Sequence, residues 1–244
     1  MEHPFLREEM ALGERAIDLL ARSHVAVFGI GGVGSYVVEG LARAGVGALT
    51  LVDDDTVGIT NLNRQLCALH STLGRPKAQV MGQRVLDINP QCQVRTIVAR
   101  YTEADKERFL DRPYDYIVDA IDLVSCKLSL IENAHRLEIP IISALGTGNK
   151  LDPTAFQVTD IAKTNFCPLA RVVRRELKAR GILHHKVLFS PEPALTPQAL
   201  DTLPPGRRSI PASVSWVPSV AGLIMAGAVV QDLIGADGGE APRP

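Results

Sequence analysis

The sequence predicts an α/β protein with a Rossmann-like, doubly wound and mainly parallel sheet. The first observation is that short, apolar, β-branched runs alternate with helix-like segments through residues 24–144, as in chains built from β-α-β units. The second is a glycine-rich run, GIGGVG at residues 29–34, which directly follows the first apolar run. Ligands of such sheets bind outside the carboxyl ends of the strands, so a site is expected at that edge.

Each element of the alternation has its own local signal. Apolar runs predict strands at residues 24–28, 48–52, 93–98, 116–120 and 139–144. Helical periodicity predicts helices at residues 35–44, 75–87 and 123–137, and Thr102 and Glu103 predict the cap of a short helix ending at Leu110. Gly45 and Gly47 mark one break between elements, and Asn89 with Pro90 marks another.

The pattern loosens beyond Thr147. A strand is expected at residues 156–161 and a basic helix at 168–179. Residues 191–211 form a proline-rich loop, and a last, apolar helix is expected at 219–234. The tail at 236–244 is rich in glycine and proline and is expected to be disordered.

Composition excludes several classes of protein. Lys and Arg number 26 and Asp and Glu 27, which gives a net charge of −1 and excludes both a wholly basic nucleic-acid coat and an acidic disordered chain. The N-terminus lacks an apolar signal core, so we expect a cytoplasmic protein. Residues 209–231 carry no charge, but their best apolar stretch, 220–230, is short of the roughly 20 residues that span a bilayer. This segment predicts a buried core helix and no membrane insertion.

The four cysteines, at positions 67, 92, 126 and 167, contain no C-x-x-C pair. This spacing argues against a tetrathiolate zinc site, and their density argues against a disulfide scaffold. Cys167 opens the basic helix, where a thiol would be somewhat acidified, but no base lies near it in the sequence. An ordinary buried thiol is therefore favoured over a nucleophile.

The glycine run has the form G-x-G-x-x-G, between a strand and a helix, which is the context that makes this motif informative. Glycines allow a tight turn, and the N–H groups that open the helix can bind phosphate oxygens. Asp53 ends the second strand nineteen residues after Gly34, where a carboxylate can bind ribose hydroxyls. The motif leaves NAD, FAD and ATP open.

Residues after the second and fourth strands favour ATP. Arg64 lies in the run NLNRQ, and Lys77 begins the next helix. Two cations here suit a triphosphate, since each can neutralise charge as pyrophosphate leaves. Asp122 follows the fourth strand, where a carboxylate can hold the Mg²⁺ that accompanies ATP. Singly, these residues could be two solvated charges and a helix cap, but together they favour a triphosphate site. We therefore predict a single domain with a nucleotide-binding core at residues 1–150 and an extension at residues 151–235.

The segments GIGGVGSYVVEGLARAGVGALTLVDDDTVGITNLNRQ and GRPKAQV resemble the adenylating domain of the ubiquitin-activating, E1-like family that includes ThiF and MoeB. DAIDLVSCKLSLI, QVTDIAKTNFCPLARVVRRELKARGI and SVSWVPSVAGLIMAG resemble its tRNA threonylcarbamoyladenosine dehydratase (TcdA/CsdL) branch. That branch implies ATP-dependent cyclisation of N6-threonylcarbamoyladenosine at position 37 of tRNA. The threonyl carboxylate would be adenylated, and the carbamoyl oxygen would close on it.

The resemblance also implies residue roles. Arg7 is similar to an arginine that reaches the triphosphate from the other subunit, which implies a homodimer. Asp53 is implied to bind the ribose, and Asp122 to serve Mg²⁺. The residues implied to line or contact the ATP phosphates are Gly29, Gly31, Gly32, Gly34, Asn61, Arg64, Gln65 and Lys77.

Three alternatives to this function stay open. One is adenylation of the C-terminus of a ubiquitin-like sulfur carrier, although the paired zinc cysteines of the MoeB and ThiF types are absent from the sequence. Another is a nicotinamide dehydrogenase. The third is a scaffold for a CsdA–CsdE-type sulfur-transfer pair, a partner that the branch suggests.

A basic segment favours tRNA as a partner. Residues 163–208 hold nine cations and three acids, a charge of +6 beside −7 for the rest of the chain. A basic segment of this kind suits contacts with phosphates, although basic helices more usually present a solvated charged face. Aromatic residues make up only 5% of the chain, so a stacking platform for single strands is not expected. Four of the cations lie at helical spacing and form a basic stripe on one helix face, namely Arg171, Arg174, Arg175 and Lys178.

Overall fold

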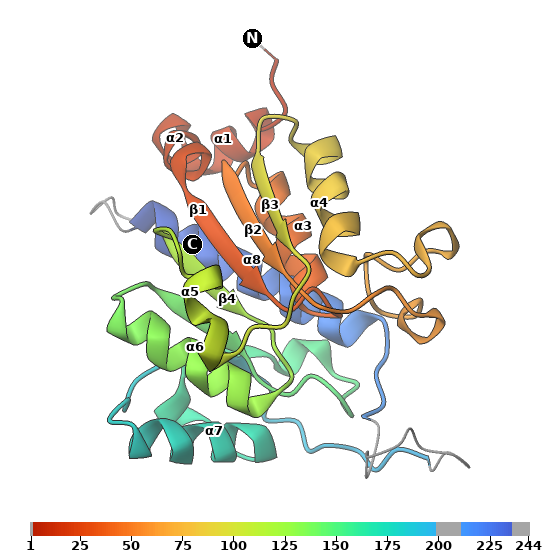
Figure 1. Cartoon of the computed structure of the whole chain (residues 1–244), viewed down its shortest axis with the longest axis vertical. Coiled ribbons are helices and arrows are strands. Elements are labelled where there is room, and N and C mark those ends of the chain that lie inside the picture. The colour runs from red at the N-terminus through yellow and green to blue at the C-terminus, as the bar shows by residue number, and fades with distance from the viewer. Residues whose placement is uncertain (1, 199–210, 236–244) are drawn as a thin grey trace.

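The computed structural model describes residues 2–198 and 211–235. Its centre is a seven-stranded sheet with the strand order β3-β2-β1-β4-β5-β7-β6 (Figure 1). All neighbouring strands are parallel except β6 and β7, which are antiparallel. This confirms the predicted mainly parallel, doubly wound sheet. The strands are β1 His24–Phe28, β2 Ala48–Val52, β3 Gln93–Ile97, β4 Tyr116–Asp119, β5 Ile141–Ala144, β6 Gln157–Asp160 and β7 Lys186–Phe189.

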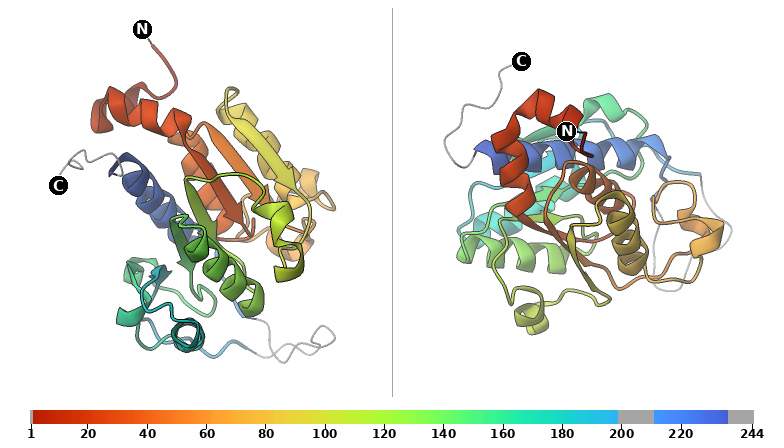
Figure 2. Two further views of the ribbon diagram at one scale, coloured as in Figure 1. Left: turned by 60° about the vertical axis from the view of Figure 1, so that its left-hand side comes forward. Right: turned by 90° about the horizontal axis from the view of Figure 1, so that it is seen from above.

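Helices cover both faces of the sheet (Figure 2). Alternate residues of β1 point to opposite faces, as strand geometry requires. Val25 and Val27 join one hydrophobic cluster with α3, α4 and α8, whereas Ala26 and Phe28 join a second with α5, α6 and α7. The helices are α1 Leu6–Leu12, α2 Glu14–Arg22, α3 Gly34–Arg43, α4 Lys77–Ile88, α5 Lys106–Phe109, α6 Val124–Arg136, α7 Pro168–Ala179 and α8 Trp216–Gly235.

The strand order reverses direction between β1 and β4. From β1 the chain proceeds outward to β2 and β3, and it then returns to place β4 on the other side of β1. The crossovers therefore leave a crevice at the carboxyl ends of β1 and β4, which is where open α/β sheets bind ligands. The loops after β1, β2 and β4 all open at this edge.

The apolar helix α8 packs closely across α3. A Cβ on Gly222 would lie 2.4 Å from the carbonyl oxygen of Val33, and one on Gly40 would lie 2.6 Å from Cβ of Ala226. Glycine at these positions lets the two helices approach. By length and composition α8 could cross a membrane, and half of its apolar window is buried inside the protein.

Several elements differ from the expectations. Helices α1 and α2 and strand β7 were not foreseen, because α1 and α2 are short and polar and β7 has four residues beside two histidines. The expected strand at 139–144 begins only at Ile141, and β6 is the antiparallel edge strand. The basic helix lies at the expected residues. Residues 199–210 of the proline-rich loop and the tail at 236–244 lie outside the described residues.

Candidate active site

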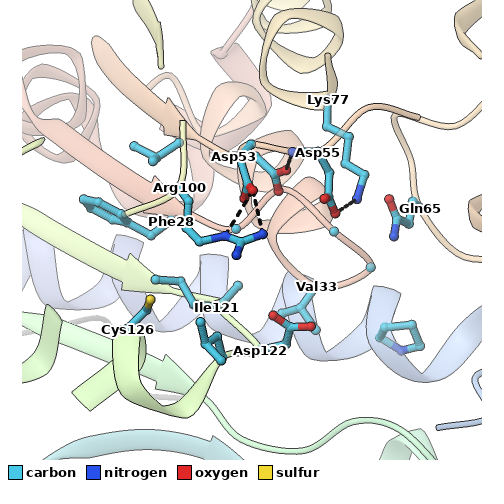
Figure 3. A pocket seen from close by; sticks show the side chains of 18 of the residues that line it. Phe28, Val33, Asp53, Asp55, Gln65, Lys77, Arg100, Ile121, Asp122 and Cys126 are labelled. Atoms are coloured by element: carbon cyan, nitrogen blue, oxygen red, sulfur yellow. Dashed lines mark hydrogen bonds and ion pairs between the residues drawn. The ribbon is translucent and has the colours of Figure 1, made fainter. Parts of the chain in front are cut away.

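A cavity of about 610 Å³ opens at the carboxyl ends of β1, β2 and β4 (Figure 3). Its walls bring together residues from distant parts of the sequence, namely the glycine turn after β1, the acidic end of β2, the start of α4 and the loop after β4. Of the residues expected from the sequence, it is lined by Gly29, Gly31, Gly32, Asp53, Arg64, Gln65, Lys77 and Asp122.

The glycine turn is held by close backbone contacts. Gly29 has φ +87°, and a Cβ on it would lie 2.6 Å from the carbonyl oxygen of Ala120. A Cβ on Gly34 would lie 1.8 Å from the carbonyl oxygen of Gly29. Gly34 does not line the cavity, so its contribution is to close the turn, while Gly31 and Gly32 face the open space.

Asp53 is fixed by two backbone hydrogen bonds. Its Oδ2 accepts a bond from the N–H of Ile30 at 2.6 Å, and its Oδ1 accepts one from the N–H of Asp55 at 2.8 Å. Burial raises the pKa of the Asp53 carboxyl, and the two N–H donors act against this shift. The carboxylate therefore ties the end of β2 to the glycine turn at the floor of the cavity.

Lys77 is the buried cation of the site. It is the first residue of α4 and is 4% exposed, and its Nζ donates to Oδ2 of Asp55 at 2.7 Å. Both residues line the cavity and lie on its β2 side (Figure 3). A buried ammonium paired with one carboxylate retains a strong attraction for an anion, because it is poorly solvated.

The segment NLNRQ contributes unequally. Gln65 is buried at the cavity wall, while Arg64 is held by Nη1 bonds to the carbonyl oxygen of Thr60 at 2.8 Å and to Oδ1 of Asn63 at 3.0 Å. Asn61 lies off the cavity wall. Its Oδ1 accepts a bond from the N–H of Gly58 at 2.9 Å, which shapes the loop rather than the site.

Asp122 follows β4 on a turn fixed by a buried ion pair. Nζ of Lys127 lies 2.6 Å from Oδ2 of Asp119, with both side chains 0% exposed. Oδ1 of Asp119 accepts a bond from the N–H of Ile121 at 3.0 Å. Asp122 itself has no hydrogen bond or ion pair with another described residue, and its carboxylate faces the cavity (Figure 3).

The sequence reasoning missed Arg100 and its partner. The guanidinium of Arg100 lies 2.8 Å from Oδ2 of Asp54 and extends along the cavity above Phe28 and Ile121 (Figure 3). Phe28, Ile121 and Cys126 give this part of the cavity an apolar floor. The only sequence signal was that Arg100 follows the third strand, at the edge where ligands are expected.

Arg7 and the basic stripe lie apart from the cavity. Arg7 is exposed on α1, which packs beyond the amino ends of the strands (Figure 1). In the stripe, Arg171, Arg175 and Lys178 are exposed. Arg174 is half-buried, and its Nη1 donates to the carbonyl oxygen of Thr164 at 2.8 Å and to Oγ1 of the same residue at 2.7 Å.

The chain matches known proteins over nearly its whole length. The ThiF family model matches residues 5–243. The Bacillus subtilis protein named tRNA threonylcarbamoyladenosine dehydratase is 45% identical over 243 residues, with 96% of each chain covered. The Escherichia coli sulfur carrier protein ThiS adenylyltransferase is 33% identical over 157 residues, 62% of each chain.

Among solved structures, the chain is similar to the E. coli tRNA N6-threonylcarbamoyladenosine dehydratase TcdA in complex with ATP. The TM-score is 0.87 at 36% sequence identity, and the match covers 97% of this chain and 96% of the other. Such agreement in fold, length and sequence decides the family. The chain belongs to the ThiF family and, within it, to the branch of the tRNA threonylcarbamoyladenosine dehydratases.

Proposed function

We propose that this chain is an ATP-dependent enzyme that cyclises N6-threonylcarbamoyladenosine at position 37 of tRNA with loss of water. The observation that carries the proposal is the cavity, which combines a glycine turn for phosphates, the buried cation Lys77 and the carboxylate of Asp122, which pairs with no other described residue. ATP is the nucleotide for which this set is suited. The similar proteins carry the name of this dehydratase, and one of their structures contains ATP.

The chemistry needs activation of a poor electrophile. The threonyl carboxylate attacks the α-phosphorus of ATP and pyrophosphate leaves, which gives an acyl-adenylate. The carbamoyl oxygen then attacks the acyl carbon, AMP leaves, and the ring closes. Because the nucleophile belongs to the same molecule, proximity assists this step and no cysteine of the protein is required.

The protein's part is to bind and to neutralise charge. Gly29, Gly31 and Gly32 would let the triphosphate approach the backbone at the start of α3, with Gly34 closing the turn. Asp53 would accept hydrogen bonds from the ribose. Lys77, Arg64 and Gln65 would contact the phosphates and stabilise the charge that develops on pyrophosphate, with Asn61 shaping their loop.

Asp122 fits a Mg²⁺ that accompanies ATP. Carboxylate oxygen is a ligand that Mg²⁺ prefers, and one or two carboxylates with substrate phosphates and waters are its usual set. Asp53, Asp54 and Asp55 also cluster, with ligand oxygens within 4.8 Å of one another. Asp54 and Asp55 are paired with Arg100 and Lys77, so Asp122 is the carboxylate most free to hold the ion.

The functional unit we propose is a cytoplasmic homodimer. Arg7 lies far from the cavity of its own chain, so a contact with ATP would require the cavity of a second copy. The outward side of α8 is apolar and includes Trp216, 47% exposed, and Leu223, 49% exposed, a surface that suits a second copy. Exposed Arg171, Arg175 and Lys178 on α7 would bind the tRNA backbone. A CsdA–CsdE-type pair stays a proposed partner.

The test is a mass assay. Wild-type protein is incubated with threonylcarbamoyladenosine-containing tRNA, ATP and Mg²⁺, and the tRNA is digested to nucleosides. The modified nucleoside is expected to lose the mass of one water, with AMP and pyrophosphate released in equal amounts. Lys77→Ala is expected to abolish both signals. No mass change with wild-type protein that binds ATP would disprove the function, and pyrophosphate exchange that depends on a sulfur-carrier protein would favour the alternative.

A further inference from the structure

The turn before α7 exposes an aromatic side chain. Phe166 is 81% exposed, whereas its neighbours Thr164 and Cys167 are each 6% exposed. The backbone of Phe166 has φ +50°, in the left-handed region that bulky side chains rarely adopt. An exposed apolar ring on an unfavourable backbone conformation is not explained by packing, and such positions are typical of functional sites.

The surrounding contacts hold this turn in place. Arg174 donates to both the carbonyl oxygen and Oγ1 of Thr164, and Oγ1 of Thr164 donates to the carbonyl oxygen of Ile161 at 2.7 Å. The N–H of Cys167 donates to the carbonyl oxygen of Asn165 at 2.6 Å. Cys167, at the other end of the turn, is buried in the hydrophobic cluster that contains residues of α6 and α7. Both ends of the turn are therefore held against the protein, and Phe166 is directed outward between them.

The turn that carries Phe166 lies at the same end of α6 and α7 as the cavity. Leu123, just before α6, lines the cavity. Helix α7 runs parallel to α6, because Val124 and Val172 line one groove between the two helices, and Arg180 lies 3.5 Å from Glu132 at its other end. Val124 and Glu132 are eight residues apart on α6, and their partners Val172 and Arg180 are also eight residues apart on α7, so the two helices run in the same direction. Phe166 precedes Val172 by six residues, so this residue lies beyond the level at which α6 starts, at the end of the helix pair nearer the cavity.

Cations surround this position. Lys163 and Arg171 are exposed on either side of Phe166, and neither side chain has a hydrogen bond or ion pair with another described residue. Arg175 and Lys178 continue the exposed charge along α7. An aromatic ring set among unpaired cations is the combination with which proteins bind unpaired nucleotides, since the ring stacks on a base and the cations contact phosphates.

We propose that Phe166 stacks on an unpaired base of the anticodon loop, beside the modified adenosine, and so presents that adenosine to the cavity. This inference rests on the proposed function. It concerns a single ring that positions the loop, in contrast to a platform that binds successive bases. The loop phosphates would lie along Lys163 and Arg171.

Steady-state kinetics on the full-length protein test this assignment. Phe166→Ala is expected to raise the KM for modified tRNA about 5- to 150-fold, the range that loss of one stacked base implies. The kcat, the KM for ATP and the melting temperature are expected to stay within twofold and about 2 °C of wild type, because the side chain is mostly exposed. Phe166→Trp is expected to restore the KM for tRNA, because it retains a stacking face.

Leu183→Ala is the matched control. Leu183 is also an exposed apolar residue, 57% exposed, but it lies in the loop after the opposite end of α7. Its substitution is expected to leave the KM for tRNA unchanged. Phe166→Ala with a KM for tRNA within twofold of wild type would overturn the inference, as would equal effects of both alanine variants or failure of Phe166→Trp to restore the KM.

A binding arm separates this inference from the proposed function. Fluorescence anisotropy measures the affinity for a labelled anticodon stem-loop without any turnover. If wild-type protein converts no tRNA, the function fails, yet a weaker affinity of Phe166→Ala alone would still support the stacking contact. If conversion occurs and Phe166→Ala binds the stem-loop as tightly as wild type, only the inference fails.

Discussion

Removal of Lys127 is expected to destabilise the fold more than any surface substitution. Its Nζ lies 2.6 Å from Oδ2 of Asp119, with both side chains 0% exposed between β4 and α6. The variant Lys127→Met keeps the length and apolar stem of the side chain but leaves the Asp119 carboxylate buried without a counter-charge. Breaking a buried pair from one side costs about 3–5 kcal/mol of the free energy of unfolding.

This loss translates into a large shift in melting temperature. For a chain of this size, 1 kcal/mol corresponds to about 2–4 °C, so the expected decrease is about 6–20 °C. Thermal denaturation followed by circular dichroism measures it. Lys106→Met is the matched control, because Lys106 pairs with Glu103 near the surface, where the two side chains are 21% and 57% exposed. Such surface pairs contribute about 0–1 kcal/mol to the free energy of unfolding.

A double variant distinguishes the buried charge from simple loss of packing. Lys127→Met with Asp119→Asn removes both charges, while the Asn side-chain oxygen can still accept the bond from Ile121 N–H. It is expected to recover most of the lost stability. Because the Ile121 bond fixes the turn that carries Asp122, the single variant should also bind ATP more weakly. A Lys127→Met protein with the same melting temperature as the Lys106→Met control would refute this reasoning.

Three further predictions concern other parts of the molecule. Gly34→Ala is expected to prevent stable folding or ATP binding, because its Cβ would lie 1.8 Å from the carbonyl oxygen of Gly29; melting curves against Gly235→Ala, where a Cβ meets open space, check this. Arg100→Ala is expected to raise the KM for ATP and leave the melting temperature nearly unchanged, since exposed ion pairs stabilise little; equal KM values would contradict it. Burial lowers the pKa of His185 from 6.5 to about 3, so between these values the unfolded chain binds a proton that the folded one does not. Urea titrations should therefore show the free energy of unfolding decreasing as the pH is lowered from about 6.5 to about 3, by up to about 1.4 kcal/mol per pH unit, and His185→Gln should reduce this slope.

Local sequence patterns were sufficient for the core of the fold. The runs HVAVF and ALTLV predicted buried strands, because apart from His24 their side chains are apolar or small and several are β-branched, and the structure places both strands at the expected residues. The glycine turn was also predictable, since G-x-G-x-x-G directly after a strand and before a helix is the pattern of a nucleotide-binding turn. Elements without such periodicity, α1 and β7 among them, were missed because their signals are no stronger than those of loops.

The candidate site divides in the same way. Asp53, Lys77 and Asp122 could be named because each follows or opens a predictable element, and parallel strands bring their carboxyl ends to one edge. The sequence could not show that Arg100 pairs with Asp54, that Arg174 turns toward Thr164, or that Asn61 supports a loop, since these contacts depend on side-chain directions set by packing.

The sequence by itself determined the parallel sheet, the glycine turn and the charge types at its edge, because these follow from the order of apolar and polar residues along a short stretch. Only the tertiary structure decided which charges are paired, which are free and which are buried. Burial and pairing depend on residues far apart in the chain, as with the outward Phe166 and with Asp122, which alone among the four aspartates that line the cavity has no partner within the described residues. Those same properties set the strength of each electrostatic interaction, and therefore what each charge can do.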